Sequence, residues 1–278
     1  MRLLSVVCSK RRRGNSELIA GIARKEGEGC GASVETIRLG DYSITECDGC
    51  MRCIFKDQRC HLDDDFYELL KKFSRADGLF LVAATYVLSI PGMMKLVIDR
   101  YLLMYPCYQN VSGRPAISVG VAGLPDWDQF QLPLMNLLLL SLGFRILDSF
   151  MAYGAGPGEA LLDTSLVRRV GDAVRRLCVH HEREHNAKAY ESCISDRCPV
   201  CFSTIFERVD SLRYRCPVCC VLGEDRGEGI YFSAESLNAH RFTPNRVKAH
   251  LEDWVLRSRD VFRKRLPDIV KVVKDLGI

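Results

Sequence analysis

Apolar runs alternate with amphipathic segments through the first two thirds of the chain. Five short runs have the length and continuous apolar character of strands that are buried on both faces. Segments with apolar residues at helical spacing separate them, and a further one, 165–185, follows the fifth run. Strands that alternate with helices predict a doubly wound parallel sheet of the α/β class. The expected strands are residues 3–7, 34–39, 78–84, 116–122 and 145–153.

The last third of the chain has a different pattern, in which two Cys-Pro-Val-Cys hooks replace the apolar runs. Cys198 and Cys201 form the first hook, Cys216 and Cys219 form the second, and the segment between them suits a hairpin. Two hooks of this kind are typical of a zinc ribbon, a unit with too little apolar core to fold without its metal. A single iron held by the same four thiolates is the alternative.

The C-terminal residues are predicted to be helical. Thr243 and Pro244 suit the N-cap and the first helical position, and apolar residues follow at helical spacing. From Arg241 onward there are ten Lys and Arg against five Asp and Glu. We interpret this excess as a solvated outer face, with a surface for nucleic acid or an acidic protein partner as the alternative. The expected apolar face consists of Val247, Leu251, Trp254 and Val255.

These patterns divide the chain into three regions. A length of 278 residues allows one full α/β domain and something smaller. We expect the α/β domain at residues 1–190, the zinc ribbon at 191–235 and the basic helical tail at 236–278.

Composition and targeting signals indicate a cytoplasmic protein. The chain is 47% hydrophobic and 27% charged, as in ordinary soluble proteins. No apolar run reaches the length of a membrane span, and no signal-peptide pattern precedes the first strand. In a reducing compartment, fourteen cysteines favour metal ligands over disulfides. A net charge of +4 is too small by itself to imply nucleic acid.

Four cysteines in the α/β region, Cys47, Cys50, Cys53 and Cys60, have the spacing C-x2-C-x2-C-x6-C. Three cysteines at consecutive x2 spacing match the runs that hold iron–sulfur cubanes. Zinc sites more often use separated hooks, so the spacing favours a [4Fe–4S] cluster. Disulfides or buried free thiols are the alternative. The aspartates at 63–65 are interpreted as a helix cap whose negative charges stabilise the positive, N-terminal end of the next helix.

The loop after the first expected strand contains Gly, Ser and Arg and leads directly into a helix. Such a strand, loop and helix form an anion site, because free backbone N–H groups and the positive end of the helix face the ligand. The basic run at 10–13 lies at the carboxyl end of a strand, where α/β folds bind ligands, although a solvated charge run is the alternative. A Walker lysine and a G-x-G-x-x-G pattern are both missing, which disfavours nucleoside triphosphates and Rossmann dinucleotides. Asn15 or Ser16 is expected to cap the helix.

Residues 1 to about 185 resemble the flavodoxin-like NADPH-dependent FMN reductase family, and within it the iron–sulfur flavoproteins of anaerobes. A phosphate loop, a second flavin loop with the helix after it, and the cysteine spacing carry the resemblance. The matching residues are Ser9-x-Arg11-x-x-Gly14-Asn15-Ser16, then Tyr86, Ser89 and Lys95 through Asp99-Arg100, and the set Cys47, Cys50, Cys53 and Cys60.

The resemblance implies that a flavodoxin-like five-stranded sheet binds FMN. It places the first loop around the FMN phosphate and the second and third loops near the isoalloxazine ring. Trp127 is interpreted either as a residue that stacks on the ring or as a core residue. The implied FMN contacts are Ser9, Arg11, Gly14, Asn15, Ser16, Thr85, Tyr86, Val87, Ser89, Gly123 and Trp127.

The resemblance further implies an oxidoreductase in which FMN and a [4Fe–4S] cluster exchange electrons. NAD(P)H or reduced ferredoxin would be the donor, and the acceptor is not identified. The family also implies a homodimer with both cofactors near the subunit boundary. A hypothesis of a different class is a non-catalytic, zinc-stabilised protein that binds nucleic acid or a protein partner through its ribbon and tail.

Overall fold

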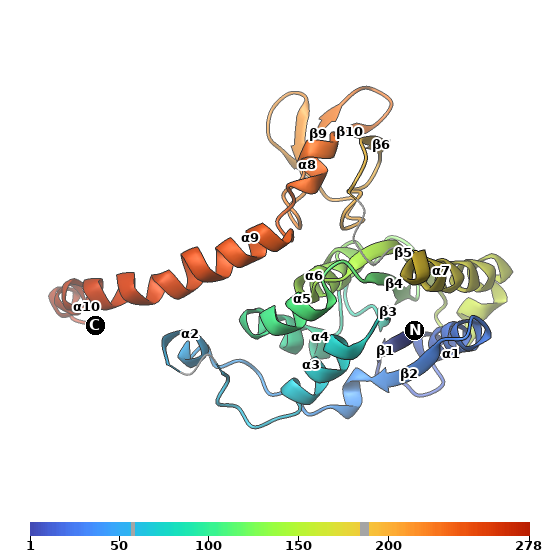
Figure 1. Cartoon of the computed structure of the whole chain (residues 1–278), viewed down its shortest axis with the longest axis horizontal. Coiled ribbons are helices and arrows are strands. Elements are labelled where there is room, and N and C mark those ends of the chain that lie inside the picture. The colour runs from blue at the N-terminus through green and yellow to red at the C-terminus, as the bar shows by residue number, and fades with distance from the viewer. Residues whose placement is uncertain (57–58, 184–188) are drawn as a thin grey trace.

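The computed structural model describes residues 1–56, 59–183 and 189–278. Its centre is a five-stranded parallel sheet with the strand order β2-β1-β3-β4-β5 (Figure 1). This order is that of flavodoxin-like folds, and it confirms the predicted doubly wound sheet. The strands are β1 (Arg2–Cys8), β2 (Ser33–Arg38), β3 (Gly78–Ala84), β4 (Pro115–Ala122) and β5 (Arg145–Tyr153).

The strand order reverses between β1 and β3, because the chain runs to β2 on one side and to β4 and β5 on the other. In such sheets, ligands bind outside the carboxyl ends of the strands beside this switch point. The loops that follow β1 and β3 therefore lie on the two sides of the expected binding crevice.

Helices cover both faces of the sheet (Figure 1). On one face, Ile19 of α1 and Val174 of α7 belong to one buried cluster with Phe80 of β3. On the other face, Phe73 of α3 and Leu139 of α6 belong to a second cluster. The helices are α1 (Asn15–Gly29), α2 (Arg52–Phe55), α3 (Phe66–Arg75), α4 (Gly92–Ile98), α5 (Tyr105–Val111), α6 (Gln131–Leu142) and α7 (Thr164–Arg183), with 3-10 turns η1 (Leu39–Asp41), η2 (Tyr101–Leu103) and η3 (Glu159–Leu162).

Each predicted strand agrees with the observed one to within one residue at either end. The helix predicted at 165–185 is α7, and residues 184 and 185 lie outside the described residues. The predicted cap of α1 is wrong. Gly14 occupies the N-cap position, without a side-chain hydrogen bond, and Asn15 is already the first helical residue. The reason is that the Asn15 side chain bonds a different part of the chain, as described below.

The ribbon region forms a second, antiparallel sheet with the strand order β6-β10-β9-β8-β7. The segment between the two cysteine hooks contains the β7–β8 hairpin, which agrees with the pattern of the sequence. Its strands are β6 (Cys193–Ser195), β7 (Glu207–Arg208), β8 (Arg213–Arg215), β9 (Leu222–Asp225) and β10 (Ile230–Phe232).

The C-terminal residues are helical, and the long helix that ends the chain extends beyond the parallel sheet (Figure 1). Thr243 and Pro244 occupy the predicted N-cap and first helical positions. Val247 and Val255 are buried, but Trp254 is 67% exposed, so its predicted place on the buried face is wrong; it stacks on His250 instead. The final helix has no buried residue, and no helix in the described part of the chain is long and apolar enough to cross a membrane. These elements are α8 (Ala234–Asn238), α9 (Pro244–Ala249), the π-helical turn η4 (His250–Leu256) and α10 (Arg257–Leu276).

Candidate flavin and metal sites

The phosphate loop connects the carboxyl end of β1 to the start of α1. Ser9 and Ser16 are buried at its two ends, and the first turn of α1 has no side-chain cap. The side chain of Arg11 folds over Gly14, since a Cβ atom on Gly14 would lie 3.2 Å from Arg11 Cδ. The loop thus brings the Arg11 side chain to an uncapped helix N-terminus, and a guanidinium and free backbone N–H groups are both suited to a phosphate.

Two side chains hold the phosphate loop in place. Asn15 Nδ2 donates hydrogen bonds to two carbonyl oxygens of the loop after β5, at 2.8 and 3.0 Å. Arg38, at the end of β2, donates to the Ser9 carbonyl at 3.2 Å and pairs with Glu17 at 2.7 Å. The amide of Asn15 is therefore engaged by the protein itself. Sequence reasoning missed Arg38, because nothing in its local pattern distinguishes it from an ordinary surface arginine.

The second predicted flavin loop follows β3 and turns tightly. Tyr86 N donates to Ser89 O at 2.8 Å, and the β-branched Val87 lies in the left-handed region with a φ of 45°. Such a conformation is strained for this residue type and is commonest at functional sites. The Thr85 hydroxyl is buried and has no hydrogen-bond partner among the described residues. An orphaned buried hydroxyl at this edge of the sheet fits a polar ligand.

The third predicted flavin loop follows β4. Trp127 is 62% exposed, so its interpretation as a core residue is wrong, and stacking on a ligand is the alternative that stays. Phe130 N donates to Leu88 O at 2.9 Å, which joins this loop to the second. The Tyr153 hydroxyl donates to Asp128 at 2.8 Å. Burial and the neighbouring Asp128 raise the pKa of Tyr153 to about 12, which keeps the phenol protonated at neutral pH.

The fold brings the predicted FMN contacts to the carboxyl edge of the parallel sheet. They lie at the ends of β1, β3 and β4, and the contacts themselves stay a prediction. Ser9, Arg11, Gly14, Asn15 and Ser16 follow β1, Thr85, Tyr86, Val87 and Ser89 follow β3, and Gly123 and Trp127 follow β4.

The cysteine loop leaves the β2 side of the sheet after η1 and ends at α3. Cys47 and Cys50 are exposed, whereas Cys53 and Cys60 are half-buried and pack against the main core. Burial raises the pKa of the Cys53 thiol, and the charges of the three other cysteines raise it further. Cys53 therefore lies within electrostatic reach of the three other thiols.

A tighter group within this loop consists of Asp48, Cys50 and His61, whose ligand atoms lie within 4.8 Å of one another. His61 Nδ1 lies 3.5 Å from Cys50 Sγ, and its Nε2 lies 3.2 Å from Asp48. Among the described residues, the four sulfurs of the cysteine loop do not form a group this tight. In a cubane each thiolate binds a different iron, so the sulfurs stand farther apart than around a single ion.

A buried ion pair anchors the cysteine loop to the core. Arg100 donates to both carboxylate oxygens of Asp64, at 2.9 and 2.6 Å, and both side chains are 1% exposed. The same two residues bond the backbone of Thr45, two residues before Cys47. Burial opposes the charge of Asp64, but the hydrogen bonds from Arg100 and Thr45 hold its pKa below the usual value. Sequence analysis interpreted the aspartates at 63–65 only as a match to a helix end and missed this anchor.

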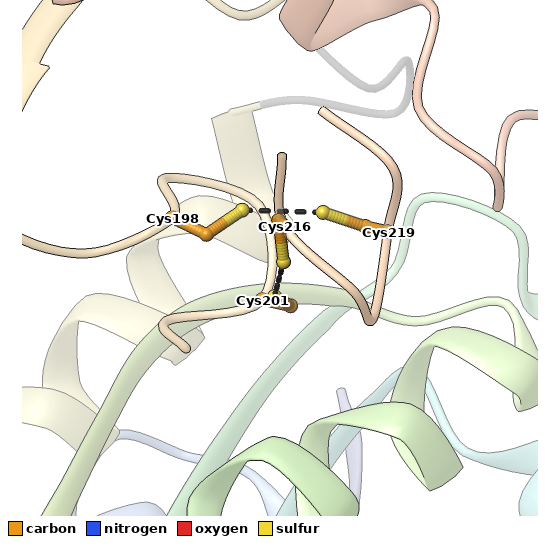
Figure 2. Close-up of side chains that lie close together, drawn as sticks. All are labelled: Cys198, Cys201, Cys216 and Cys219. Carbon is orange, nitrogen blue, oxygen red and sulfur yellow. Dashed lines mark hydrogen bonds between the residues drawn. The ribbon is translucent and has the colours of Figure 1, made fainter. Parts of the chain in front are cut away.

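The four cysteines of the ribbon lie together in the interior of the protein (Figure 2). All four residues are fully buried. Cys198 Sγ lies 3.1 Å from Cys219 Sγ, and Cys201 Sγ lies 3.3 Å from Cys216 Sγ. Their ligand atoms all lie within 4.8 Å of one another, which suits one metal ion bound by all four.

The two hooks of the ribbon have the same backbone conformation. Phe202 N donates to Cys198 O, and Cys220 N donates to Cys216 O, both at 2.8 Å. Phe202 and Cys220 both lie in the left-handed region, with φ of 58° and 61°. The repeated turn places two thiols from each hook around one point.

The fold and these loops define a flavodoxin-like protein with an anion-binding loop and two groups of cysteines. A sequence model of the NADPH-dependent FMN reductase family matches residues 1–155, more than half of the chain. The protein belongs to this family, which assigns it to the FMN-dependent oxidoreductases. The predicted resemblance is confirmed.

Named relatives agree with this assignment. An iron–sulfur flavoprotein of Archaeoglobus fulgidus is 31% identical over 147 residues, which are 53% of this chain and 71% of the relative. An iron–sulfur flavoprotein of Methanosarcina thermophila is 29% identical over 104 residues, 37% of this chain and 54% of the relative. The structure of a flavone reductase superposes with a TM-score of 0.70 and 18% identity, covering 98% of this chain and 92% of the other. This last similarity establishes the fold alone.

Proposed function

We propose that the protein is an FMN-dependent oxidoreductase that also carries a [4Fe–4S] cluster. NAD(P)H or reduced ferredoxin would supply electrons, which pass on to an acceptor. The observation that carries the proposal is the position of two loops. The phosphate loop follows β1, and the cysteine loop follows the adjacent, hydrogen-bonded strand β2. A flavin and a cluster would therefore be held at the same edge of one sheet.

The residues at this edge suit FMN. Arg11 and the uncapped start of α1 would bind the phosphate, and the exposed turn at Tyr86 and Val87 would lie along the ring. Thr85 offers a buried hydroxyl that has no protein partner among the described residues. Arg38 would act indirectly, because it positions the loop rather than reaching the ligand. The side chain of Asn15 also positions the loop, and Asn15 stays a predicted FMN contact.

The cysteine loop suits a cluster. FMN can exchange electrons in pairs or singly, and an iron–sulfur cluster exchanges them one at a time. Cys53 and Cys60 would hold the cluster on its protein side, while Cys47 and Cys50 would hold it from the exposed side. The Asp64–Arg100 pair would keep the first part of the loop fixed while electrons pass. His61 would be positioned by Asp48 beside the Cys50 thiolate.

The proposal includes a reducing, cytoplasmic setting and a homodimer. All fourteen cysteines are free thiols, which supports the first. The homodimer rests on the resemblance to the iron–sulfur flavoproteins. Zn²⁺ would occupy the ribbon, which we expect to be a structural rather than a redox site.

Anaerobic purification followed by an absorption spectrum and cofactor analysis tests the proposal. We expect flavin absorbance with a broad iron–sulfur shoulder, one FMN per chain, and matching iron and acid-labile sulfide. A colourless protein that contains only zinc would favour the non-catalytic binding protein instead. Stoichiometric zinc at the cysteine loop, with FMN but no sulfide, would leave a flavin reductase with two structural metal sites.

A further inference from the structure

The ribbon cysteines are buried inside the core that supports the flavin sheet. Cys198, Cys201 and Val221 belong to the same buried cluster as Met135 and Leu139 of α6. The two regions are therefore not separate packing units, although the sequence suggests a ribbon with its own small fold.

A buried chain of hydrogen bonds connects the first hook to the parallel sheet. Asn136 Nδ2, from the middle of α6, donates to the carbonyl oxygen of Cys201 at 2.7 Å and to the Ser149 hydroxyl at 2.9 Å. The Ser118 hydroxyl lies 2.6 Å from Asn136 Oδ1 and 2.8 Å from Ser149 Oγ. All three polar side chains are fully buried, so each one depends on the others for its hydrogen bonds.

The same helix also reaches the flavin edge. Gln131, the first residue of α6, is fully buried and its Nε2 donates to the carbonyl oxygen of Ala83 at 3.1 Å, directly before the second flavin loop. Gln131 and Asn136 are separated by about 7.5 Å along the helix axis. One helix therefore contacts the end of β3 at its start and the cysteine hook in its middle.

We propose that Cys198, Cys201, Cys216 and Cys219 bind one Zn²⁺, and that this ion is a structural part of the flavin-binding sheet through Asn136. Around a zinc ion with Zn–S bonds of about 2.3 Å, tetrahedral thiolates lie about 3.8 Å apart. The observed separations of 3.1 and 3.3 Å are close to this arrangement. Burial of all four cysteines leaves no open position for water or substrate, which makes the site structural.

The ion has a clear physical role at this position. Four buried thiolates repel one another and lose their hydration, so they need a cation to remain ionised. When the ion holds the first hook, the Cys201 carbonyl stays in place for Asn136. When the ion is lost, the hook can move, and Asn136 loses the acceptor of one of its two donated hydrogen bonds, which leaves a buried N–H group without a partner. The inference does not depend on the iron–sulfur cluster.

The first experiment compares Asn136→Leu with Asn238→Leu. Asn238 also makes three hydrogen bonds, two with the backbone of Tyr190 and one with Ala234 in its own helix, and none of them connects the hook to the sheet. We expect the purified protein to contain one zinc per chain. In a chelator competition, Asn136→Leu should hold zinc roughly 10- to 100-fold more weakly, as for other groups that support a metal ligand. Asn238→Leu should hold it like the unaltered chain.

A merely structural Asn136 would lower the melting temperature without changing zinc affinity, and that result would overturn the proposal. Iron in place of zinc at this site would also overturn it. If Asn136→Leu does not fold, Asn136→Asp provides the same comparison, because it keeps an acceptor for Ser118 but removes both donated bonds.

The second experiment measures hydrogen exchange in Cys198→Ser, with Cys193→Ser as the control. We expect β4, β5 and α6 to lose protection together with the ribbon strands. If only the ribbon strands lose protection, the ion supports the ribbon alone and the proposal fails. Zinc content and hydrogen exchange do not require a flavin, so a protein without FMN would refute the proposed function and leave this test intact.

Discussion

The chain contains two groups of four cysteines with opposite surroundings. In the cysteine loop, Cys47 and Cys50 are exposed, Cys53 and Cys60 are half-buried, and one buried ion pair fixes the chain just before them. Their four sulfurs, all of them in the described part of the chain, do not form one tight group. The ribbon group is fully buried, its sulfurs nearly touch, and a polar network ties it to the sheet. The difference indicates two kinds of metal chemistry. Under the proposed function, electrons would enter and leave a cluster near the surface, whereas a structural ion would be closed off from solvent.

The largest expected effect is the loss of a ribbon ligand. Cys216→Ser should destabilise the whole protein by more than about 3 kcal/mol, because the folding free energy of such units includes the binding of their metal. Thermal unfolding and zinc content would measure it. Cys193→Ser, a half-buried cysteine outside the group, serves as the control. Equal melting temperatures for the two variants would contradict a structural ion in the ribbon group.

The second-largest effect is expected at the Asp64–Arg100 ion pair, which anchors the cysteine loop. Arg100→Met leaves the Asp64 carboxylate buried without its partner, which costs about 3–5 kcal/mol. Urea unfolding would measure the loss, and proteolysis within the loop should become faster. Arg114→Met is the matched control, because Arg114 pairs with Asp77 in a more exposed position. Replacing Asp64 by Leu in the Arg100→Met background should restore part of the stability; no recovery would contradict the role of the unpaired charge.

Acid should loosen the first part of the cysteine loop, which the Asp64–Arg100 pair holds. The folded pKa of Asp64 lies below its ordinary value of 3.8. Its pairing therefore contributes fully above that value and is lost as the pH falls through the lower, folded pKa. Hydrogen exchange of residues 43–47 between pH 5 and pH 2 would follow this change. Asp64→Asn should abolish the pH dependence, and a dependence that persists in this variant would assign it to another group.

A smaller effect is expected at the phosphate loop, which contains neither group of cysteines. Arg11→Ala should weaken FMN binding roughly ten- to a hundredfold, because it removes a charge-assisted contact. Arg12→Ala should weaken FMN binding less, because position 12 is not one of the residues that match the phosphate loop of the family. Titration of the apoprotein with FMN provides the measurement. Wild-type affinity in Arg11→Ala would show that the loop does not bind the phosphate.

The smallest effect on folding should come from the cysteine loop itself. Cys50→Ala should abolish the cluster, and Cys60→Ala should leave a labile three-iron or degraded form, because each thiolate holds one iron. Both variants should keep FMN and nearly the original melting temperature, like the surface control Cys30→Ala. Iron and sulfide analysis with electron paramagnetic resonance would test this. An unchanged cluster signal in Cys50→Ala would exclude that residue as a ligand.

The sequence was sufficient for features that depend on neighbouring residues. Continuous apolar runs predict the strands of a buried parallel sheet, and the repeated Cys-Pro-Val-Cys hooks predict a four-thiolate group. The order of the loops along the chain also predicts which residues meet at the carboxyl edge. Each of these signals is local, or follows from a general rule of the fold.

The supporting contacts could not be predicted in this way. Asn136 and Cys201 are 65 residues apart, and Arg100 and Asp64 are 36 apart. Each is an ordinary polar residue in its local pattern, and only the packing of distant elements gives it a partner. The cap of α1 failed for the same reason. Asn15 is a favourable capping residue, but its amide bonds the loop after β5 instead.

Burial of the ribbon group has a consequence for how the protein is made. The hooks at residues 198–219 are synthesised after all five strands of the sheet, yet they complete one of its two buried clusters. During synthesis, that face of the sheet is therefore incomplete until the hooks emerge. The cysteine loop imposes no such order, because Cys47 and Cys50 are exposed and Cys53 and Cys60 are only half-buried in the finished fold. If the proposed ions are correct, a shortage of zinc would leave misfolded chains, whereas a shortage of iron would leave folded protein without a cluster.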